Sequence, residues 1–183
     1  MGSENIDTTG KDQTTNLNSE EIVITEYCAR YEKESRVLLY QLQEHLVNID
    51  DEHVQIHTAN YGEAYLSFLL RNIQNHHGTI MLAIKKPNVI GLVAGWIEEK
   101  DEEDYLTNRC PKRGLITELV VAPSMRSRGV GKTLITQMEK RFAEQDCEFV
   151  AVDVFAPNKE AIRFYESSGY RPRNIELYKR IQR

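Results

Sequence analysis

Residues 126–135 of the chain read RSRGVGKTLI, and they closely follow an apolar run, ITELVVAP. The stretch holds three cations, two glycines and a threonine, a combination that favours an anion. Backbone N–H groups at the start of a helix attract phosphate, and the helix dipole strengthens that attraction. Two kinds of phosphate site therefore have to be compared. One holds a nucleoside triphosphate for cleavage, and the other only grips the phosphates of a cofactor.

Arg126 distinguishes these two sites. A hydrolysing phosphate loop needs a glycine, four further residues and then Gly-Lys-Ser/Thr. If Gly131, Lys132 and Thr133 form its end, the first glycine belongs at position 126, which is an arginine. A side chain there obstructs the turn that points the backbone amides inward. The NTPase interpretation, with Asp153 as a magnesium ligand, is therefore disfavoured. A loop that holds a pyrophosphate fits better, and an ordinary turn with solvated cations is the structural alternative.

A second group of candidate residues lies in NKEAIRFYESSGY, residues 158–170. Asn158 and Tyr165 are seven positions apart, so on a helix they share one face. Both also have purely structural interpretations. Asn158 is a good helix N-cap, and Tyr165 continues an apolar stripe with Ala161 and Ile162.

The hydrophobic pattern indicates the elements that must position these residues. Strands are predicted at 79–85 and 89–99 as an antiparallel hairpin, and the strands 115–122 and 148–155, linked by a helix, should be parallel. The full set of predicted elements is strands at 20–27, 79–85, 89–99, 115–122, 148–155 and 175–181 and helices at 30–47, 61–75, 131–144 and 159–168. Residues 1–19 are polar and expected to be a disordered tail, which leaves 20–183 as a single domain.

Composition sets limits on the function. The 183 residues are 40% hydrophobic and 28% charged with a net charge of −5, which is ordinary for one globular domain and unlike a nucleic-acid binder. No apolar run is long enough to span a bilayer, and the first 18 residues lack the apolar core of a secretory signal. Three cysteines are too few for a disulfide framework or a zinc site, so a cytoplasmic location without a bound metal is expected. His53 and His57 lie near acidic residues, a combination that could indicate a metal site, but they are interpreted as ordinary loop residues.

The two motifs, in this order, resemble those of the GNAT superfamily of acyl-CoA-dependent N-acetyltransferases. ELVVAPSMRSRGVGKTLI resembles the family's strand, CoA-pyrophosphate loop and helix, and NKEAIRFYESSGY resembles its second signature. The resemblance implies an α/β fold. Its mixed sheet would have six to seven strands flanked by about four helices, with the fourth and fifth strands (115–122 and 148–155) splayed apart.

The resemblance also implies the cofactor site. The pantetheine arm of acetyl-CoA would hydrogen-bond to the fourth strand like an additional strand, and Asn158 would contact the cofactor near the pantetheine. Tyr165 would protonate the departing CoA thiolate. The backbone of the fourth strand would contribute through Leu119, Val120 and Val121, and the pyrophosphate would be held by Arg126, Arg128, Gly129, Val130, Gly131, Lys132 and Thr133.

A base is the remaining chemical requirement. An amine attacks a thioester only when neutral, but an alkylamine has a pKa near ~10.4, so a proton acceptor helps. Glu118 and Asp153 interrupt the two apolar strands that splay apart. Glu118 ranks first, because many family members carry an acid at this position, and Asp153 ranks second. Either carboxylate could instead pair with a cation or face solvent.

The expected function is direct transfer of the acetyl group from acetyl-CoA to a primary amine, with a non-catalytic CoA-binding sensor or assembly module as the alternative. The acceptor is not identified by the sequence. Residues 98–104 hold six acids in seven positions, which could attract a cationic amine but is more typical of a solvated loop. Only fourteen residues follow Gly169, less than many family members use for a closing hairpin. A partner subunit could supply the missing wall, so a homodimer is one expectation.

Overall fold

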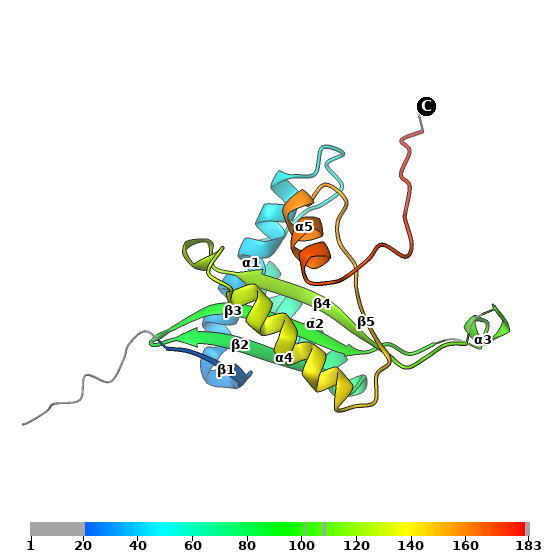
Figure 1. The fold of residues 1–183 in the computed structure, drawn as a ribbon. Coiled ribbons are helices and arrows are strands. Elements are labelled where there is room, and N and C mark those ends of the chain that lie inside the picture. The colour runs from blue at the N-terminus through cyan, green and yellow to red at the C-terminus, as the bar shows by residue number, and fades with distance from the viewer. Residues whose placement is uncertain (1–20, 101, 108, 182–183) are drawn as a thin grey trace, which may run out of the picture.

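The computed structural model describes residues 21–100, 102–107 and 109–181, and the tail predicted at 1–19 lies outside these ranges. A single five-stranded sheet runs in the order β1-β2-β3-β4-β5 (Figure 1). The first three pairings are antiparallel, and β4 and β5 are parallel, as the hydrophobic pattern predicted. The strands are β1 (Ile22–Glu26), β2 (Thr79–Lys85), β3 (Asn88–Ile97), β4 (Arg113–Val121) and β5 (Phe149–Val152).

Helices cover both faces of this sheet. One hydrophobic cluster joins α1 and α2 to one face, and a second joins α4 and α5 to the other. Figure 1 shows α4 crossing in front of the sheet and α2 behind it. Because both faces are covered, six of the seven residues of β2 are buried without alternation. The helices are η1 (Ala29–Tyr31), α1 (Glu32–Asn48), α2 (Tyr61–Asn75), α3 (Asp104–Thr107), η2 (Pro123–Met125), α4 (Val130–Ala143) and α5 (Lys159–Ser167).

The closing strand predicted at 175–181 is wrong. The described chain forms no strand after β5, so the sheet has five strands and not six to seven. Ile175, Leu177 and Ile181 would share one face of a strand, but a strand also needs a partner edge. No backbone hydrogen bond joins 171–181 to any other described segment. Two smaller differences are that β5 stops at Val152 and that the short helix α3 was not predicted.

The divergence of β4 and β5 is confirmed. Their parallel pairing covers only Arg113–Ile116 and Phe149–Val152. Beyond Ile116, β4 is paired with β3 alone among the described strands. The second half of β4 therefore presents one edge whose backbone groups are open to a ligand.

No helix in the described part of the chain has the combined length and apolar character that crossing a bilayer demands.

Candidate active site

The loop between β4 and α4 leads into the N-terminus of α4, which no side chain caps. Gly129 is the residue before α4, and its φ of 82° is a left-handed conformation that glycine adopts without strain. No side chain caps this end of the helix, so the first N–H groups of α4 have no intrahelical partner. A Cβ added at Gly129 would meet nothing within 4 Å, so the space beside this residue is open. The end of the helix suits a pyrophosphate.

The predicted cations lie in the loop and in the first turn of α4, on either side of this helix start. Arg126, Arg128 and Lys132 are all exposed. The Arg126 Nε donates to the Val121 carbonyl oxygen at 3.3 Å, so the loop folds back on the end of β4. The Thr133 hydroxyl donates to the Gly129 carbonyl oxygen at 3.2 Å and steadies the turn. Val130 is buried in the core beneath the loop and fixes where α4 begins.

The end of α5 fixes the position of Tyr165. Gly169, with a φ of 95°, donates its N–H to the Glu166 carbonyl oxygen at 3.0 Å. Tyr170 donates its N–H to the Tyr165 carbonyl oxygen at 3.1 Å, which completes a Schellman motif. The rings of Tyr165 and Tyr170 then meet edge to face, with centroids 5.4 Å apart, and the Tyr170 hydroxyl donates to Glu139 Oε1 at 2.9 Å. The Gly-Tyr pair of the second signature thus holds Tyr165 in place.

Tyr165 is almost fully buried, with 7% of its surface exposed. Burial, and secondarily the charge of Glu118, raises the pKa of its hydroxyl well above the ordinary value. No hydrogen bond joins this hydroxyl to another described residue, so it remains available to a ligand. A phenol in this state is neutral and is a proton donor rather than a base.

Glu118 lies on the half of β4 that has lost its pairing with β5, and it shares the α2-facing side of the strand with Val120. Its carboxylate keeps some exposed surface but is closely surrounded by protein, and this desolvation raises its pKa to about 7. The Tyr65 hydroxyl on α2 donates a short hydrogen bond to Glu118 Oε1 and acts in the opposite direction, lowering the pKa. A carboxylate of this kind can exchange a proton near neutral pH.

Three aromatic rings on α2 extend from this carboxylate. Tyr61 stacks on Tyr65 with centroids 5.1 Å apart, and Tyr65 stacks on Phe68 at 5.6 Å. The Tyr61 hydroxyl donates to Gln43 Oε1 at 3.3 Å. Gln43 of α1 in turn donates to the Ile56 carbonyl oxygen at 2.7 Å and so holds the connection between α1 and α2. The stack links the desolvated carboxylate of Glu118 to the loop between α1 and α2.

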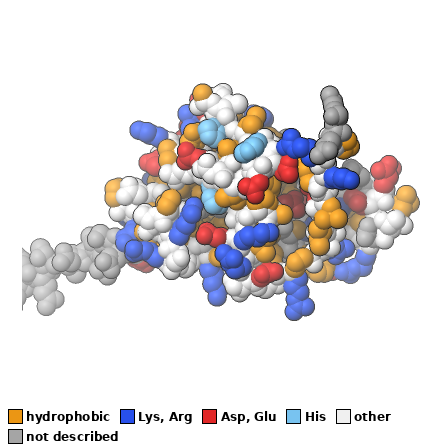
Figure 2. Space-filling view, turned by 90° about the horizontal axis from the view of Figure 1, so that it is seen from above, with side chains coloured by type: hydrophobic (Ala, Val, Ile, Leu, Met, Phe, Trp, Pro, Cys, Tyr) orange, Lys and Arg blue, Asp and Glu red, His pale blue; other side chains and the backbone are white. Residues whose placement is uncertain are grey.

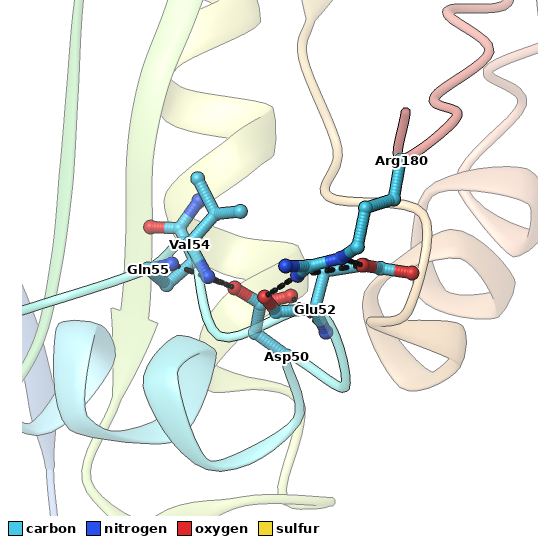
Figure 3. Close-up of polar contacts among 5 residues, drawn as sticks. All are labelled: Asp50, Glu52, Val54, Gln55 and Arg180. Atoms are coloured by element: carbon cyan, nitrogen blue, oxygen red, sulfur yellow. Dashed lines mark hydrogen bonds and ion pairs between the residues drawn. The ribbon is translucent and has the colours of Figure 1, made fainter. Parts of the chain in front are cut away.

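Asp50 organises that connecting loop (Figure 3). Its buried carboxylate accepts backbone N–H groups from Val54 at 2.7 Å and Gln55 at 2.6 Å through Oδ2, and from Glu52 at 3.1 Å through Oδ1. Arg180, near the C-terminus, donates to Glu52 Oε2 at 3.0 Å and to the Glu52 carbonyl oxygen at 2.8 Å. The loop is therefore rigid at its base and is contacted by the C-terminal segment.

The other two predicted polar residues have different surroundings. Asn158 caps α5, because its side-chain oxygen accepts the Ala161 N–H at 3.1 Å, so its predicted role as a helix N-cap is confirmed. Asp153 follows β5 directly, is exposed, and makes no hydrogen bond to another described residue. Its charge raises the pKa of Arg113 as a minor cause. Of the two carboxylates, Glu118 alone is paired and desolvated.

The described acidic residues of 98–104 lie along an arm that extends from the sheet between β3 and β4 and ends in α3 (Figure 1). Burial alone would raise the pKa of Glu98, but hydrogen bonds from Arg113 and Lys100 outweigh it and hold the pKa below its usual value. A hollow of about 400 Å³ along this arm includes none of the predicted site residues, and its lining consists of Glu98, Glu99, Lys100, Tyr105, Cys110, Pro111 and Lys112. Across the described residues, no group of three or more His, Cys, Asp or Glu side chains could hold a metal ion.

Tyr61, Tyr65 and Gln43 are site residues that sequence reasoning missed. The two tyrosines lie four positions apart on α2, which is also the spacing of an ordinary apolar stripe. The only sign of this contact in the sequence was a tyrosine hydroxyl within that apolar stripe and a carboxylate within an apolar strand. Tyr65 and Glu118 are 53 positions apart, so nothing local to either residue indicates their contact.

A model of the Acetyltransferase (GNAT) family matches residues 39–170. The glucosamine 6-phosphate N-acetyltransferase of Candida albicans is 30% identical over 105 residues, which make up 56% of this chain and 68% of the relative. Among solved structures, aminoglycoside N-acetyltransferase AAC(6')-Iy in complex with CoA superimposes with a TM-score of 0.69 at 17% identity, covering 91% of this chain and 98% of that one. Glucosamine-6-phosphate N-acetyltransferase of Arabidopsis thaliana gives 0.63 at 18% identity, covering 89% and 100%.

Proposed function

Because the chain belongs to the GNAT family and is an acyl-CoA-dependent N-acetyltransferase with acetyl-CoA as its donor, we propose that it transfers the acetyl group directly to a primary amine of a small molecule or peptide. One observation carries the proposal. Glu118, a carboxylate with a pKa of about 7, lies on the open half of β4, and its charge adds to the burial that raises the pKa of the neutral Tyr165 hydroxyl. A base and an acid are the two groups that this reaction needs.

Glu118 is the base in this proposal. A carboxylate with a pKa of about 7 is ionised in part of the molecules at neutral pH, and the ionised form can take a proton from the ammonium form of the acceptor, directly or through water. The neutral amine then attacks the thioester carbonyl carbon. As the C–N bond forms and the C–S bond breaks, the amine loses a second proton and the sulfur gains an electron pair. The Tyr165 hydroxyl supplies a proton to that sulfur, and the second proton from the nitrogen passes through water to restore the hydroxyl. Glu118 then releases the first proton to solvent.

The loop before α4 and the open edge of β4 would position the donor. Residues 129–133 offer uncapped backbone amides to the pyrophosphate, and Arg126, Arg128 and Lys132 add positive charge. The backbone of Leu119, Val120 and Val121 would pair with the pantetheine arm. Asn158 would contact the cofactor through its side-chain N–H₂ group, since its oxygen already caps α5.

The acceptor would enter on the α2 side of β4, where Glu118 and Tyr65 lie. An amino sugar is the first acceptor to test, because named relatives act on glucosamine 6-phosphate and on aminoglycosides. The aromatic stack of Tyr61, Tyr65 and Phe68 offers flat apolar surface beside polar groups, which suits the face of a sugar ring or the stem of an alkylamine.

Replacement of Tyr165 by Phe tests the proposed chemistry. The variant keeps the ring packing against Tyr170 but removes the proton donor, so kcat should fall by on the order of a hundredfold or more. The Kd for CoA, measured by calorimetry, should stay within about threefold of the value for the unmodified enzyme, since the hydroxyl donates its proton only as the thiolate leaves.

Tyr170→Phe is the matched control. It also removes the hydroxyl of a tyrosine, half-buried and just after α5, but this hydroxyl is bound to Glu139. Its kcat should change by less than about threefold. Equal losses of kcat in the two variants, or a kcat of Tyr165→Phe equal to that of the unmodified enzyme, would remove Tyr165 from the mechanism.

A further inference from the structure

Gln43 on α1 has a side-chain amide whose orientation is fixed by its neighbours. Its nitrogen Nε2 lies 2.7 Å from the carbonyl oxygen of Ile56, and a carbonyl oxygen can only accept a hydrogen bond. The same nitrogen donates to Gln55 Oε1 at 3.2 Å, so both of its hydrogens are engaged. The amide oxygen Oε1 is therefore the atom that faces Tyr61, and it can only accept.

This orientation determines where the Tyr61 hydroxyl directs its hydrogen. The hydroxyl donates to Gln43 Oε1 at 3.3 Å, so its single hydrogen is directed toward α1. No described residue donates a hydrogen bond to the Tyr61 oxygen in return, so its lone pairs are available to a ligand. Burial, and secondarily the charge of Glu118, raises the pKa of this hydroxyl, which keeps it neutral. Tyr61 can thus offer a ligand a hydrogen-bond acceptor but not a donor.

Glu118, next to this aromatic stack, presents the same polarity. Its Oε1 accepts from Tyr65, whose ring stacks on Tyr61 with centroids 5.1 Å apart, and its Oε2 accepts no hydrogen bond from another described residue. None of the ion pairs between described residues includes this carboxylate, and no cation is among the causes of its raised pKa. Because an ionised carboxylate enclosed by protein is costly without a partner, the ionised form favours a cationic ligand.

The ligand group that fits this polarity carries several hydrogens and a positive charge. A primary ammonium has three N–H donors and no lone pair, so it can donate to both oxygens at once. A hydroxyl has one hydrogen, so it can donate to one of the oxygens and leaves the other without a donor. Tyr61 and Glu118 both keep some exposed surface, so a group of this size can reach them from solvent.

We propose that the Tyr61 oxygen and Glu118 Oε2 together bind the acceptor as its primary ammonium form, and that Gln43 makes the site selective for nitrogen over oxygen acceptors. This inference rests on the proposed function, since it assigns residues to the acceptor side of the same reaction. One N–H of the ammonium donates to Tyr61 and another to Glu118. Glu118 then takes its proton, and the neutral amine keeps its hydrogen bond to Tyr61. Gln43 acts through Tyr61, as a positioning residue.

The selectivity would come from these few groups and not from the wider surface. Figure 2 shows one face of the molecule, on which acidic and basic side chains are interspersed and do not separate into patches of one sign. A surface of mixed sign does not by itself concentrate cations. A change to one of the groups that contact the ammonium should therefore change the preference measurably.

Binding of butylamine and of 1-butanol to the whole chain saturated with CoA tests this polarity without acetyl transfer. The two probes share the same apolar stem and differ in the terminal group. At pH 8 an alkylamine, with a pKa near ~10.4, is almost entirely ammonium, and most Glu118 carboxylates are ionised. Ligand-observed NMR titrations should give butylamine an affinity at least about tenfold higher than that of 1-butanol, since hydrogen bonds to a charged group are the stronger ones.

Two variants assign the preference to the proposed groups. Gln43→Met keeps the length of the side chain but removes Oε1, so the Tyr61 hydroxyl can turn and donate to an alcohol. The ratio of the two affinities should fall by about threefold or more. Tyr61→Phe keeps the ring stack but removes the oxygen, and it should weaken butylamine by about tenfold while 1-butanol changes little. A loosened loop would instead weaken both probes alike.

Gln55→Ala is the matched control. It removes one hydrogen bond of Gln43 to the same loop but leaves the Ile56 carbonyl oxygen to orient the amide, so the ratio should not change. Circular dichroism establishes that each variant is folded.

Three results would overturn the inference: no binding of butylamine, equal affinities for the two probes, or a ratio that neither Gln43→Met nor Tyr61→Phe alters. Selective binding without acetylation of any amine would contradict the proposed function and leave this inference standing. Acetylation of an amine without selective binding would do the reverse.

Discussion

At position 118 the fold holds a carboxylate in surroundings that oppose its charge. Desolvation raises the pKa of Glu118 to about 7, and the hydrogen bond from Tyr65 keeps it from rising further. A group that is half ionised near neutral pH can both accept and release a proton at little cost. Tyr65 therefore acts on the chemistry through Glu118, as a positioning residue rather than as a catalytic one.

The predicted effect of Tyr65→Phe is a displaced pH profile. The phenyl ring keeps its stacking on Tyr61 and Phe68, but the ionised Glu118 loses its hydrogen bond, so its pKa rises. The limb of kcat/KM that reports the ionisation of the base should move to higher pH by about one unit, because a hydrogen bond to a charged group is worth about 1.5 kcal/mol or more. Activity measured from pH 5 to pH 9 checks this.

Tyr61→Phe is the control for that profile. It removes a hydroxyl from the same aromatic stack, but the hydroxyl donates to Gln43 and not to Glu118. The limb should keep its position in this variant, although KM for the acceptor can change. If Tyr65→Phe lowers activity equally at all pH values, Tyr65 has only a structural role.

At the scale of elements, most of the fold was predictable from local pattern. The helix 61–75 and the strand 79–85 were predicted with their observed bounds, because their apolar residues recur at the helical or strand period and end at turn residues. The strand at 175–181 shows where this reasoning fails. Alternation indicates that a segment can be a strand, but only another chain segment at the right place makes it one.

The candidate site was predictable to the extent that it is built from contiguous residues. The loop before α4 and the end of α5 are local structures, and both form at the predicted positions. The pairing of Glu118 with Tyr65 was not predictable, because it depends on the packing of α2 against one face of β4. A contact that forms through tertiary packing does not appear in a single sequence as a fixed spacing between two residues.

The uncapped N-terminus of α4 leads to a prediction about cofactor binding. Replacing Arg126 and Lys132 together by Ala removes two charges beside the uncapped amides, so the Kd for CoA should rise by about tenfold to a hundredfold. Turnover at saturating acetyl-CoA should change far less, since the pyrophosphate is remote from the thioester. Calorimetry and initial rates measure the two effects separately.

Lys140→Ala with Arg141→Ala is the matched control for that pair. It removes the same charge from the same helix, but at the last turn of α4, where both side chains lie in weak surface ion pairs. CoA affinity should be nearly unchanged. A similar loss in both double variants would mean that overall charge, and not a pyrophosphate contact, governs binding.

At the scale of the whole molecule, the buried carboxylate affects stability. Below about pH 4.3, Glu118 is protonated in both the folded and the unfolded chain. Between that pH and about 7, the folded chain binds a proton that the unfolded chain has released, so this contribution to stability falls as pH rises. Above about 7 the folded chain holds an ionised carboxylate in an unfavourable place.

Glu118→Gln should therefore inactivate the enzyme and stabilise it. The amide oxygen can still accept from Tyr65 but carries no charge, so the free energy of unfolding at pH 8 should exceed that of the unmodified chain by about 3 kcal/mol. At pH 5 the difference should largely vanish, which provides the internal control. Urea unfolding at both pH values measures it, and an equal difference at both would mean that ionisation of Glu118 is not its cause.

Gly131 links the two halves of the proposed cofactor site. A side chain at this position would come within 3.3 Å of the ring of Phe164, the neighbour of Tyr165 on α5. The loop that would hold the pyrophosphate and the helix that carries the proposed acid are thus in direct contact. Changes at positions 131 and 164 should consequently be non-additive, with a larger residue at one tolerated only beside a smaller residue at the other. Substitutions in the loop that would bind the donor and substitutions in the helix that carries the proposed acid are therefore expected to depend on each other during evolution.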